Sequence, residues 1–210
     1  MSSIPEVRLS FSYLLYDISK RILAPHYDSP IVTEEKCLEY TEAYKKEWAK
    51  IEMQYLAGMT EILGLSFYRS VIDVSLAPFF IPQSDPLILH FNNEPDHFVD
   101  VLAHELIHVL LTDNNKIQVN SNSNFNLTEE WTNLFGEHDF KVLVHIPVHA
   151  VLKYLYLDVL NEEQRFVRDV EHSKAKSWGE AYTKAWEYVE KEGYKEIIEK
   201  LKLSYGAVDA

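Results

Sequence analysis

The 210-residue chain is long enough for one domain with a sizeable core, or for a compact catalytic domain with a helical extension. Apolar residues make up 47% and aromatic residues 13%, which excludes a disordered chain. The net charge of −13 and the pI near 5.1 argue against nucleic-acid and anionic-lipid partners.

Three features bear on the compartment. The lone cysteine, Cys37, excludes an internal disulfide framework and is expected to be an ordinary small apolar residue in a reducing compartment. Met1 to Ser10 lacks the basic and apolar regions of a signal peptide. The longest apolar run, Val142 to Leu160, is interrupted by polar residues and proline, which argues against a membrane span. We therefore expect a cytoplasmic protein.

The first predicted elements are helical. Val7 to Leu23 is predicted as a short helix that ends at Ala24-Pro25. Thr33 to Leu63 is predicted as one long amphipathic helix, because apolar residues recur at steps of three or four. Gly64 is its expected stop.

Two β-rich runs follow. Val71 to Leu76 and Leu87 to Phe91 are predicted as strands of a small sheet with a proline-rich connection between them. A helix capped by Asn93 is expected to run to about Thr112, and the Asn/Ser-rich stretch Asp113 to Asn126 is expected to be an exposed loop.

The helix that follows Asn93 carries the pattern His104-Glu105-Leu106-Ile107-His108. Two histidines four residues apart lie on the same side of a helix and can hold one metal ion. Glu105 lies about 100° round the helix, where its carboxylate can reach a water bound to the metal without binding the metal itself. The pattern therefore predicts a zinc site with Glu105 as general base.

The flanking residues strengthen this interpretation. Val101 stands three residues before His104, the two residues inside the motif are uncharged, and apolar residues follow it. The alternative is a core helix whose histidines donate to backbone carbonyls, but two buried histidines and a glutamate are costly on an apolar helix unless a metal organises them.

Asp100, one turn earlier, either orients His104 or is a plain surface acid. His90 and His97 could line the cleft or be ordinary polar residues.

Catalytic zinc usually has a third protein ligand. The glycine and third histidine of the metzincin pattern are absent after His108, so the ligand is expected to be a glutamate from the next helix, capped by Thr128. Glu129 is preferred, because Asn133 lies one turn later and can hydrogen-bond a ligating histidine. Glu130 is the alternative, because it shares a face with the inward-turning Leu134.

The last part of the chain is predicted to be helical. Asp139 to Leu160 is apolar on nearly every face, as in a buried helix, and Pro147 is expected to bend it. His145 and His149 share one face of this helix, and His138 is expected on the same stripe. The tail from about 161 to 203 is highly charged, with Trp178, Tyr182, Trp186 and Val189 on one stripe.

These motifs resemble the gluzincins, the zinc metallopeptidases with HExxH on one helix and glutamate on the next, and in particular the small minigluzincins. The resemblance covers about Val71 to Leu160. It implies an α+β, zincin-like fold with a small sheet, an active-site helix and a glutamate helix. It also implies that the strand at Leu87 to Phe91, or the one at Val71 to Leu76, forms the edge beside the substrate. Asn133 departs from the acid that the family more often has there.

The resemblance also implies a downstream residue that stabilises the oxyanion. His149 is preferred over His145, and both could instead be core histidines that bond carbonyls freed by Pro147. The expected organisation is a helical segment at 1–66, a catalytic core at 67–160 and a helical segment at 161–210.

The predicted function is zinc-dependent hydrolysis of a peptide or protein substrate, with one Zn²⁺ per chain held by His104, His108 and Glu129. Alternatives are a zinc-binding protein with a latent or inactive site, and a metal-dependent hydrolase of a non-peptide amide. The oligomeric state cannot be read from the sequence.

Overall fold

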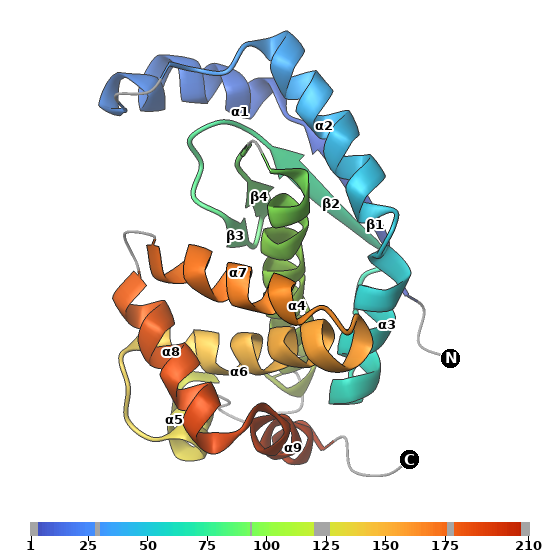
Figure 1. Cartoon of the computed structure of the whole chain (residues 1–210), viewed down its shortest axis with the longest axis vertical. Helices are drawn as coiled ribbons and strands as arrows, with labels where there is room; N and C mark the ends of the chain where they lie inside the picture. Colours follow the sequence, from blue (N-terminus) through green and yellow to red (C-terminus); the bar gives the residue numbers. More distant parts are fainter. Residues whose placement is uncertain (1–3, 28–29, 93, 120–126, 176–178, 207–210) are drawn as a thin grey trace. The chain divides into compact units, whose positions relative to one another are not determined.

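The computed structural model describes residues 4–27, 30–92, 94–119, 127–175 and 179–206 (Figure 1). It combines helices with a small mixed sheet, so the fold class is α+β. The chain divides into two compact units. The sheet unit comprises Ser3–Met53 and Arg69–Val109, and the helical unit comprises Gln54–Tyr68 and Leu110–Ala210 with the first two residues of the chain.

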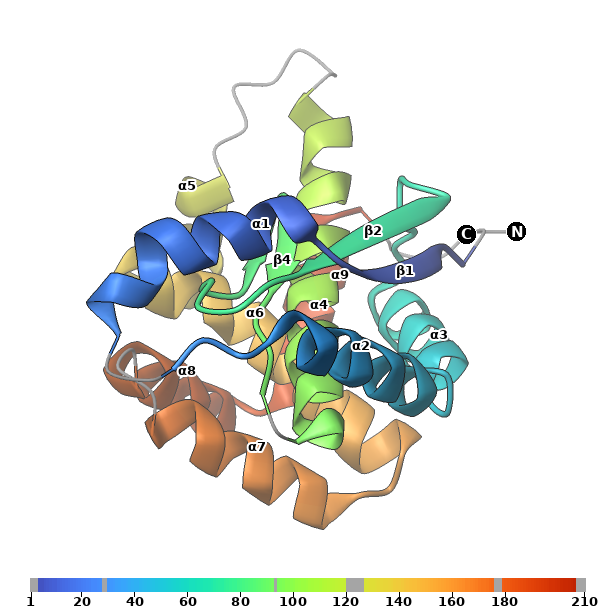
Figure 2. The same cartoon turned by 90° about the horizontal axis from the view of Figure 1, so that it is seen from above.

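The sheet unit is built on four described strands in the order β1-β2-β4-β3. Strands β1, β2 and β4 run parallel, and β3 pairs antiparallel with β4. Figure 2 shows β1 beside β2, where Leu9 is in register with Val74. The strand bounds are Glu6–Phe11 (β1), Val71–Leu76 (β2), Gln83–Ser84 (β3) and Leu87–Leu89 (β4).

Strand β1 corrects the prediction of a helix from Val7. Its apolar residues Val7, Leu9 and Phe11 alternate with polar ones, and this period of two belongs to a strand with one buried face. The helical part begins only after Ser12, whose side chain accepts a hydrogen bond from the Leu15 amide at 3.3 Å. It consists of α1 (Tyr13–Ile18), the π-helical turn η1 (Ser19–Leu23) and the 3₁₀ turn η2 (Ala24–His26).

The predicted edge of the sheet is also wrong. Strand β2 lies between β1 and β4, and β4 lies between β2 and β3. The described edges are therefore β1 and the two-residue β3. The error follows from the missed β1, because the sequence analysis assigned no strand before Val71.

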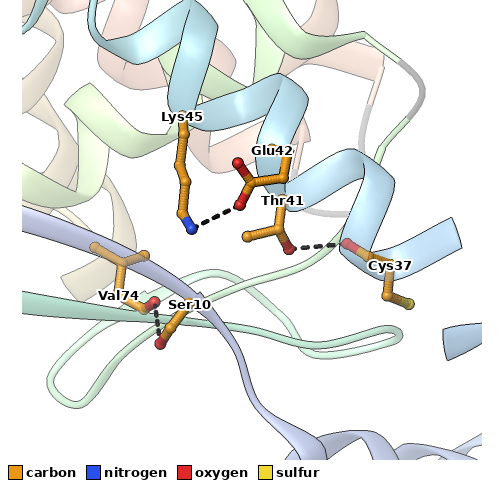
Figure 3. Close-up of polar contacts among 6 residues, drawn as sticks. All are labelled: Ser10, Cys37, Thr41, Glu42, Lys45 and Val74. Carbon is orange, nitrogen blue, oxygen red and sulfur yellow. Dashed lines mark hydrogen bonds and ion pairs between the residues drawn. The ribbon is translucent and has the colours of Figure 1, made fainter. Parts of the chain in front are cut away.

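Helix α2 (Glu34–Trp48) begins at its cap Thr33 and carries the lone cysteine. Cys37 is fully buried, which fits an ordinary small apolar residue, and burial raises the pKa of its thiol to about 11. Figure 3 shows that the Thr41 hydroxyl donates to the Cys37 carbonyl at 2.8 Å and that Lys45 pairs with Glu42. In the sheet, the Ser10 hydroxyl lies 3.5 Å from the Val74 carbonyl oxygen.

The long helix predicted from Thr33 to Leu63 is two helices. Helix α2 ends at Trp48 and α3 runs over Glu52–Leu63. The three intervening residues include neither glycine nor proline, so the sequence gives no local signal for the break. The stop at Gly64 is confirmed, because Gly64 has a φ of +65°, in the left-handed region that glycine favours.

Helix α4 covers Pro95–Val119 and carries the HExxH motif. It passes the predicted end at Thr112, because the Asn114 side chain donates to the Leu110 carbonyl at 2.8 Å and to the Ser66 carbonyl at 3.0 Å. These two bonds satisfy an amide that would otherwise compete with the helix. The predicted cap, Asn93, lies outside the described residues, as does part of the predicted loop.

The start of α4 is fixed by α2. The Tyr44 hydroxyl accepts a hydrogen bond from the Asn92 amide at 2.8 Å and donates one to the Asn92 carbonyl at 2.5 Å. The Tyr44 ring stacks on Phe98 with a centroid separation of 3.8 Å. Burial raises the pKa of this hydroxyl, which therefore remains protonated and able to donate.

The helical unit is organised around the buried helix α6, which packs against α5, α8 and α9 (Figure 1). Pro147 lies inside α6 without ending it. The helical tail is confirmed over its described part. Of the predicted stripe, Trp186 and Val189 are buried, whereas Trp178 lies outside the described residues. Thr128 falls inside α5 rather than before it. The bounds are Leu127–Phe135 (α5), Phe140–Tyr154 (α6), Leu155–Val159 (η3, a π-helical turn), Glu163–Ala175 (α7), Gly179–Glu192 (α8) and Tyr194–Ser204 (α9).

Among the residues that the structure describes, one stretch satisfies the length and composition of a membrane span. Phe140–Val159 has a mean hydropathy of 1.4, so its polar residues do not by themselves exclude a span by length and composition. Two thirds of this stretch is buried inside the protein, as in the core helix of a globular domain. It is therefore weak evidence for a membrane.

Candidate metal centre

The HExxH residues lie on the part of α4 that belongs to the sheet unit. The Nε2 atoms of His104 and His108 are 3.2 Å apart, and their ring planes differ by 63°. Two nitrogens that each lie about 2.0–2.1 Å from a tetrahedral zinc are about 3.3 Å from one another. The structure therefore brings these two predicted ligands together at the separation that a shared zinc ion requires.

Glu105 is buried, and Ala103 and Leu106 near it in the sequence are fully buried. Its side chain has 6% of its surface exposed, which is rare for a glutamate. A carboxylate in such an environment is available for proton transfer away from bulk water.

Asp100 is the second buried acid of this helix. It is 1% exposed, so the interpretation of Asp100 as a surface acid is wrong. A carboxylate oxygen of Asp100 lies within 4.8 Å of a ring nitrogen of His97, its neighbour one turn earlier on α4. His90 and His97 are both partly buried.

The predicted glutamate ligand lies in the helical unit, on α5. Glu129 and Asn133 are exposed, whereas Trp131 and Phe135 form the buried face of the helix. Glu130 is partly buried.

The two oxygens of the Glu130 carboxylate differ. Oε1 accepts a hydrogen bond from the Ser204 hydroxyl of α9. Oε2 is buried and has no hydrogen-bond partner among the described residues. A buried oxygen of this kind is costly unless a ligand binds it. Of the two candidates, only Glu130 combines burial with an available donor atom.

The chemistry of these donors fits zinc. Imidazole nitrogen and carboxylate oxygen are the donors of His₂Glu catalytic sites. The His104 and His108 nitrogens have the spacing of zinc ligands, and Glu130 offers an otherwise unsatisfied oxygen. His104 and His108 could therefore hold a metal ion, and the source of a third ligand is a matter for the proposed function.

The histidines of α6 have other surroundings. His145 is buried, and its Nδ1 lies 2.5 Å from the Lys141 carbonyl oxygen, so that nitrogen carries a proton and donates. Burial lowers the pKa of His145. The carbonyl that Pro147 frees is that of Leu143, so the predicted bond to a carbonyl exists but its acceptor is a different one.

His149 is the residue predicted to stabilise the oxyanion. It is 1% exposed and stacks on Trp186, with ring centroids 4.1 Å apart and planes within 9°. Tyr182 lies against both histidines, 4.2 Å from the His145 ring and 5.5 Å from the His149 ring. His138, in contrast, is exposed and precedes α6, so it does not share their buried stripe. The catalytic role of His149 remains a prediction.

Two residues at the end of α9 were missed by the sequence analysis. Ser204 binds Glu130, and the Tyr205 hydroxyl donates to the Leu111 carbonyl of α4 at 3.2 Å. A serine and a tyrosine near the end of a charged helix carry no signal of their own. Only the packing of the helical unit brings them to α5 and α4.

No protein-family model, curated protein or solved structure matches this chain. The gluzincin resemblance is therefore a prediction that rests on the motifs alone. Function has to be argued from the residues and their geometry.

Proposed function

We propose that the protein is a zinc-dependent metallopeptidase with a zincin-like version of its α+β fold. The observation that carries the proposal is the pair of HExxH imidazoles with Nε2 atoms 3.2 Å apart and a buried glutamate beside them. The burial of Glu105 on the motif helix supports the proposal, because buried ionisable carboxylates gather at functional sites.

Zinc, when bound, supplies a Lewis acid that polarises a carbonyl and lowers the pKa of a water molecule. Glu105 accepts a proton from the water as its oxygen bonds to the carbonyl carbon of the substrate. The C–N bond then breaks, and Glu105 returns the proton to the departing amine. His104 and His108 hold the metal.

The third ligand is proposed to come from α5. Glu129 follows from the sequence pattern, whereas the buried, unpaired oxygen supports Glu130. The two assignments differ in one measurable property, because replacement of the true ligand by glutamine removes an anionic donor and weakens zinc binding. Replacement of the other glutamate by glutamine has little effect on zinc binding.

Zinc stoichiometry tests the proposal directly. Metal content is measured by mass spectrometry for the wild type and for His104→Ala, Glu129→Gln and Glu130→Gln. His26→Ala is the matched control, because His26 is exposed in η2 of the same unit as His104. We expect one zinc per chain in the wild type and the control, and loss in His104→Ala and in one glutamate variant. Absence of stoichiometric zinc from the wild type would falsify the proposal.

Substrate class is tested in parallel with a quenched peptide library and a panel of small amides. Cleavage of peptides that depends on zinc supports the peptidase. Cleavage of small amides alone indicates the non-peptide hydrolase. Zinc without turnover of either substrate set indicates a zinc-binding protein.

A further inference from the structure

We propose that the hollow between helices α7 and α8 binds a small apolar carboxylate, with Lys174 as the partner of its anionic group. Both helices belong to the helical unit, and no residue of the HExxH motif lines the hollow. The inference adds a second binding site to the protein, and it depends neither on zinc nor on peptide hydrolysis.

The hollow has the size of a small-molecule site. Its volume is about 380 Å³, and ligand pockets commonly measure about 300–1,000 Å³. Helices α7 and α8 pack against each other (Figure 1), and the exposed walls between them are mainly apolar, which favours an apolar ligand body. The hollow is lined by Val170, Lys174, Trp186, Glu187, Glu190 and Lys191.

The Trp186 wall is held in place by three contacts within the helical unit. One face of its ring stacks on His149, with centroids 4.1 Å apart. Phe166 meets it edge-on at 5.5 Å, and its Nε1 donates to the Ser173 hydroxyl at 3.1 Å. Because this side chain is already fixed, ligand binding requires little ordering of the wall.

Two charges of the rim are balanced by residues that do not line the hollow. The Lys153 ammonium donates to the Glu190 carboxylate at 2.5 Å. The Lys191 ammonium lies 3.2 Å from a carboxylate oxygen of Glu192. Neither Glu190 nor Lys191 therefore presents an uncompensated charge to a ligand.

The other two rim charges differ from one another. The hydrogen bond with Glu180 and, further down in effect, the charge of Glu187 raise the pKa of Lys184, so Glu187 has a cation near it on α8. The Lys174 ammonium makes no ion pair or hydrogen bond with any described residue. One uncompensated cation matches the single charge of a carboxylate. A phosphate monoester, with about two negative charges, fits less well beside Glu187 and Glu190.

The experiment measures binding to the full chain by isothermal titration calorimetry with three probes that share one apolar body. They are 4-phenylbutyrate, which is anionic, 4-phenylbutan-1-ol, which is uncharged, and 4-phenylbutylamine, which is cationic. We expect 4-phenylbutyrate to bind at one site per chain. The alcohol and the amine should bind about 10-fold more weakly or less, because they lack the charged hydrogen-bond acceptor.

Four variants locate the probe. Lys174→Met keeps the aliphatic stem and removes the charge, so it should bind 4-phenylbutyrate about 10-fold more weakly. Lys174→Arg keeps the charge and should bind it as the wild type does. Lys200→Met is the matched control, because Lys200 lies on α9 outside the hollow and has no ion pair with a described residue. Val170→Phe fills the hollow and should weaken the binding of all three probes.

Three results would overturn the inference. They are the absence of saturable binding to the wild type, equal affinity for the three probes, and unchanged binding of 4-phenylbutyrate to Lys174→Met. A carboxylate can also bind zinc, so the titration is repeated with His104→Ala. Binding that is lost in His104→Ala but kept in Lys174→Met places the probe at the metal centre and also overturns the inference. Binding kept in His104→Ala supports the hollow, and it does so even where the proposed function fails.

Discussion

Helices α4 and α6 each carry two histidines four residues apart, but the two pairs differ in geometry. On α4, the Nε2 atoms of His104 and His108 are 3.2 Å apart. On α6, His145 donates to the Lys141 carbonyl and His149 lies flat against Trp186. The centroids of these two histidine rings are 5.7 Å apart.

The difference shows that two histidine pairs with the same spacing on a helix can differ in how their rings lie. Spacing places both rings on one face, and the surrounding residues then decide whether their nitrogens converge. On α6 the aromatic residues Tyr182 and Trp186 take up the ring faces, which favours packing. On α4 the neighbouring side chain is the buried acid Glu105, which acts as general base in the proposed function.

The largest expected difference between the two pairs comes from removing one histidine from each helix. His104→Ala removes a ligand and should weaken zinc binding at least about 100-fold, so that stoichiometric metal is lost. His149→Ala should retain one zinc per chain. Metal analysis after gel filtration checks both, and loss of zinc from both variants would show that the two pairs are not functionally distinct.

The second prediction concerns Glu105, an acid of α4 that has no counterpart beside the histidines of α6. Glu105→Gln removes the proton acceptor and should lower kcat by about 10²- to 10⁴-fold while zinc content is unchanged. Glu94→Gln, an exposed change just before α4, serves as control and should retain full activity. Normal peptide cleavage by Glu105→Gln contradicts its role as general base.

The third prediction tests the packing role of α6. Trp186 is 2% exposed, stacks on His149 and donates from Nε1 to the Ser173 hydroxyl at 3.1 Å. Trp186→Ala should lower the free energy of unfolding by about 3–5 kcal/mol, because it removes a large buried ring. Urea unfolding of the metal-free protein measures this change. Tyr68→Ala, at a residue 75% exposed, should stay within about 0.5 kcal/mol of wild type.

The smallest expected effect is a pH dependence on α6. Burial lowers the pKa of His145 below its usual 6.5, so the unfolded chain binds a proton more readily than the folded one. The stability contributed by the neutral ring is therefore present above pH 6.5 and is lost as the pH falls below it, by at most about 1.4 kcal/mol per pH unit. His145→Leu should flatten the slope between pH 5 and 6.5 in the metal-free protein. An unchanged slope would show that groups other than His145 cause the pH dependence.

The sequence predicted the features that depend on local pattern. The HExxH helix, the buried helix around Pro147 and the stop at Gly64 all follow from periodicity or from one residue's chemistry. Strand β1 was also readable, because Val7, Leu9 and Phe11 alternate with polar residues, but its six residues were assigned to the helix that follows.

The remaining features depend on contacts between distant residues. The extension of α4 beyond Thr112 requires the Ser66 carbonyl as a partner for Asn114, and no local pattern indicates it. The sequence could place a glutamate on α5, but it could not distinguish Glu129 from Glu130. That distinction depends on which side of α5 is buried and on a hydroxyl from α9.

The two-way hydrogen bond between Tyr44 and Asn92 has a consequence for hydrogen exchange. An amide that precedes a helix normally exchanges with solvent within seconds, because local fraying exposes it. The Asn92 amide is instead bound to a fully buried tyrosine that is stacked on Phe98. It should exchange as slowly as the amides in the middle of α4. In deuterium uptake, the protection of the motif helix would therefore begin at Asn92, a residue of the loop before it.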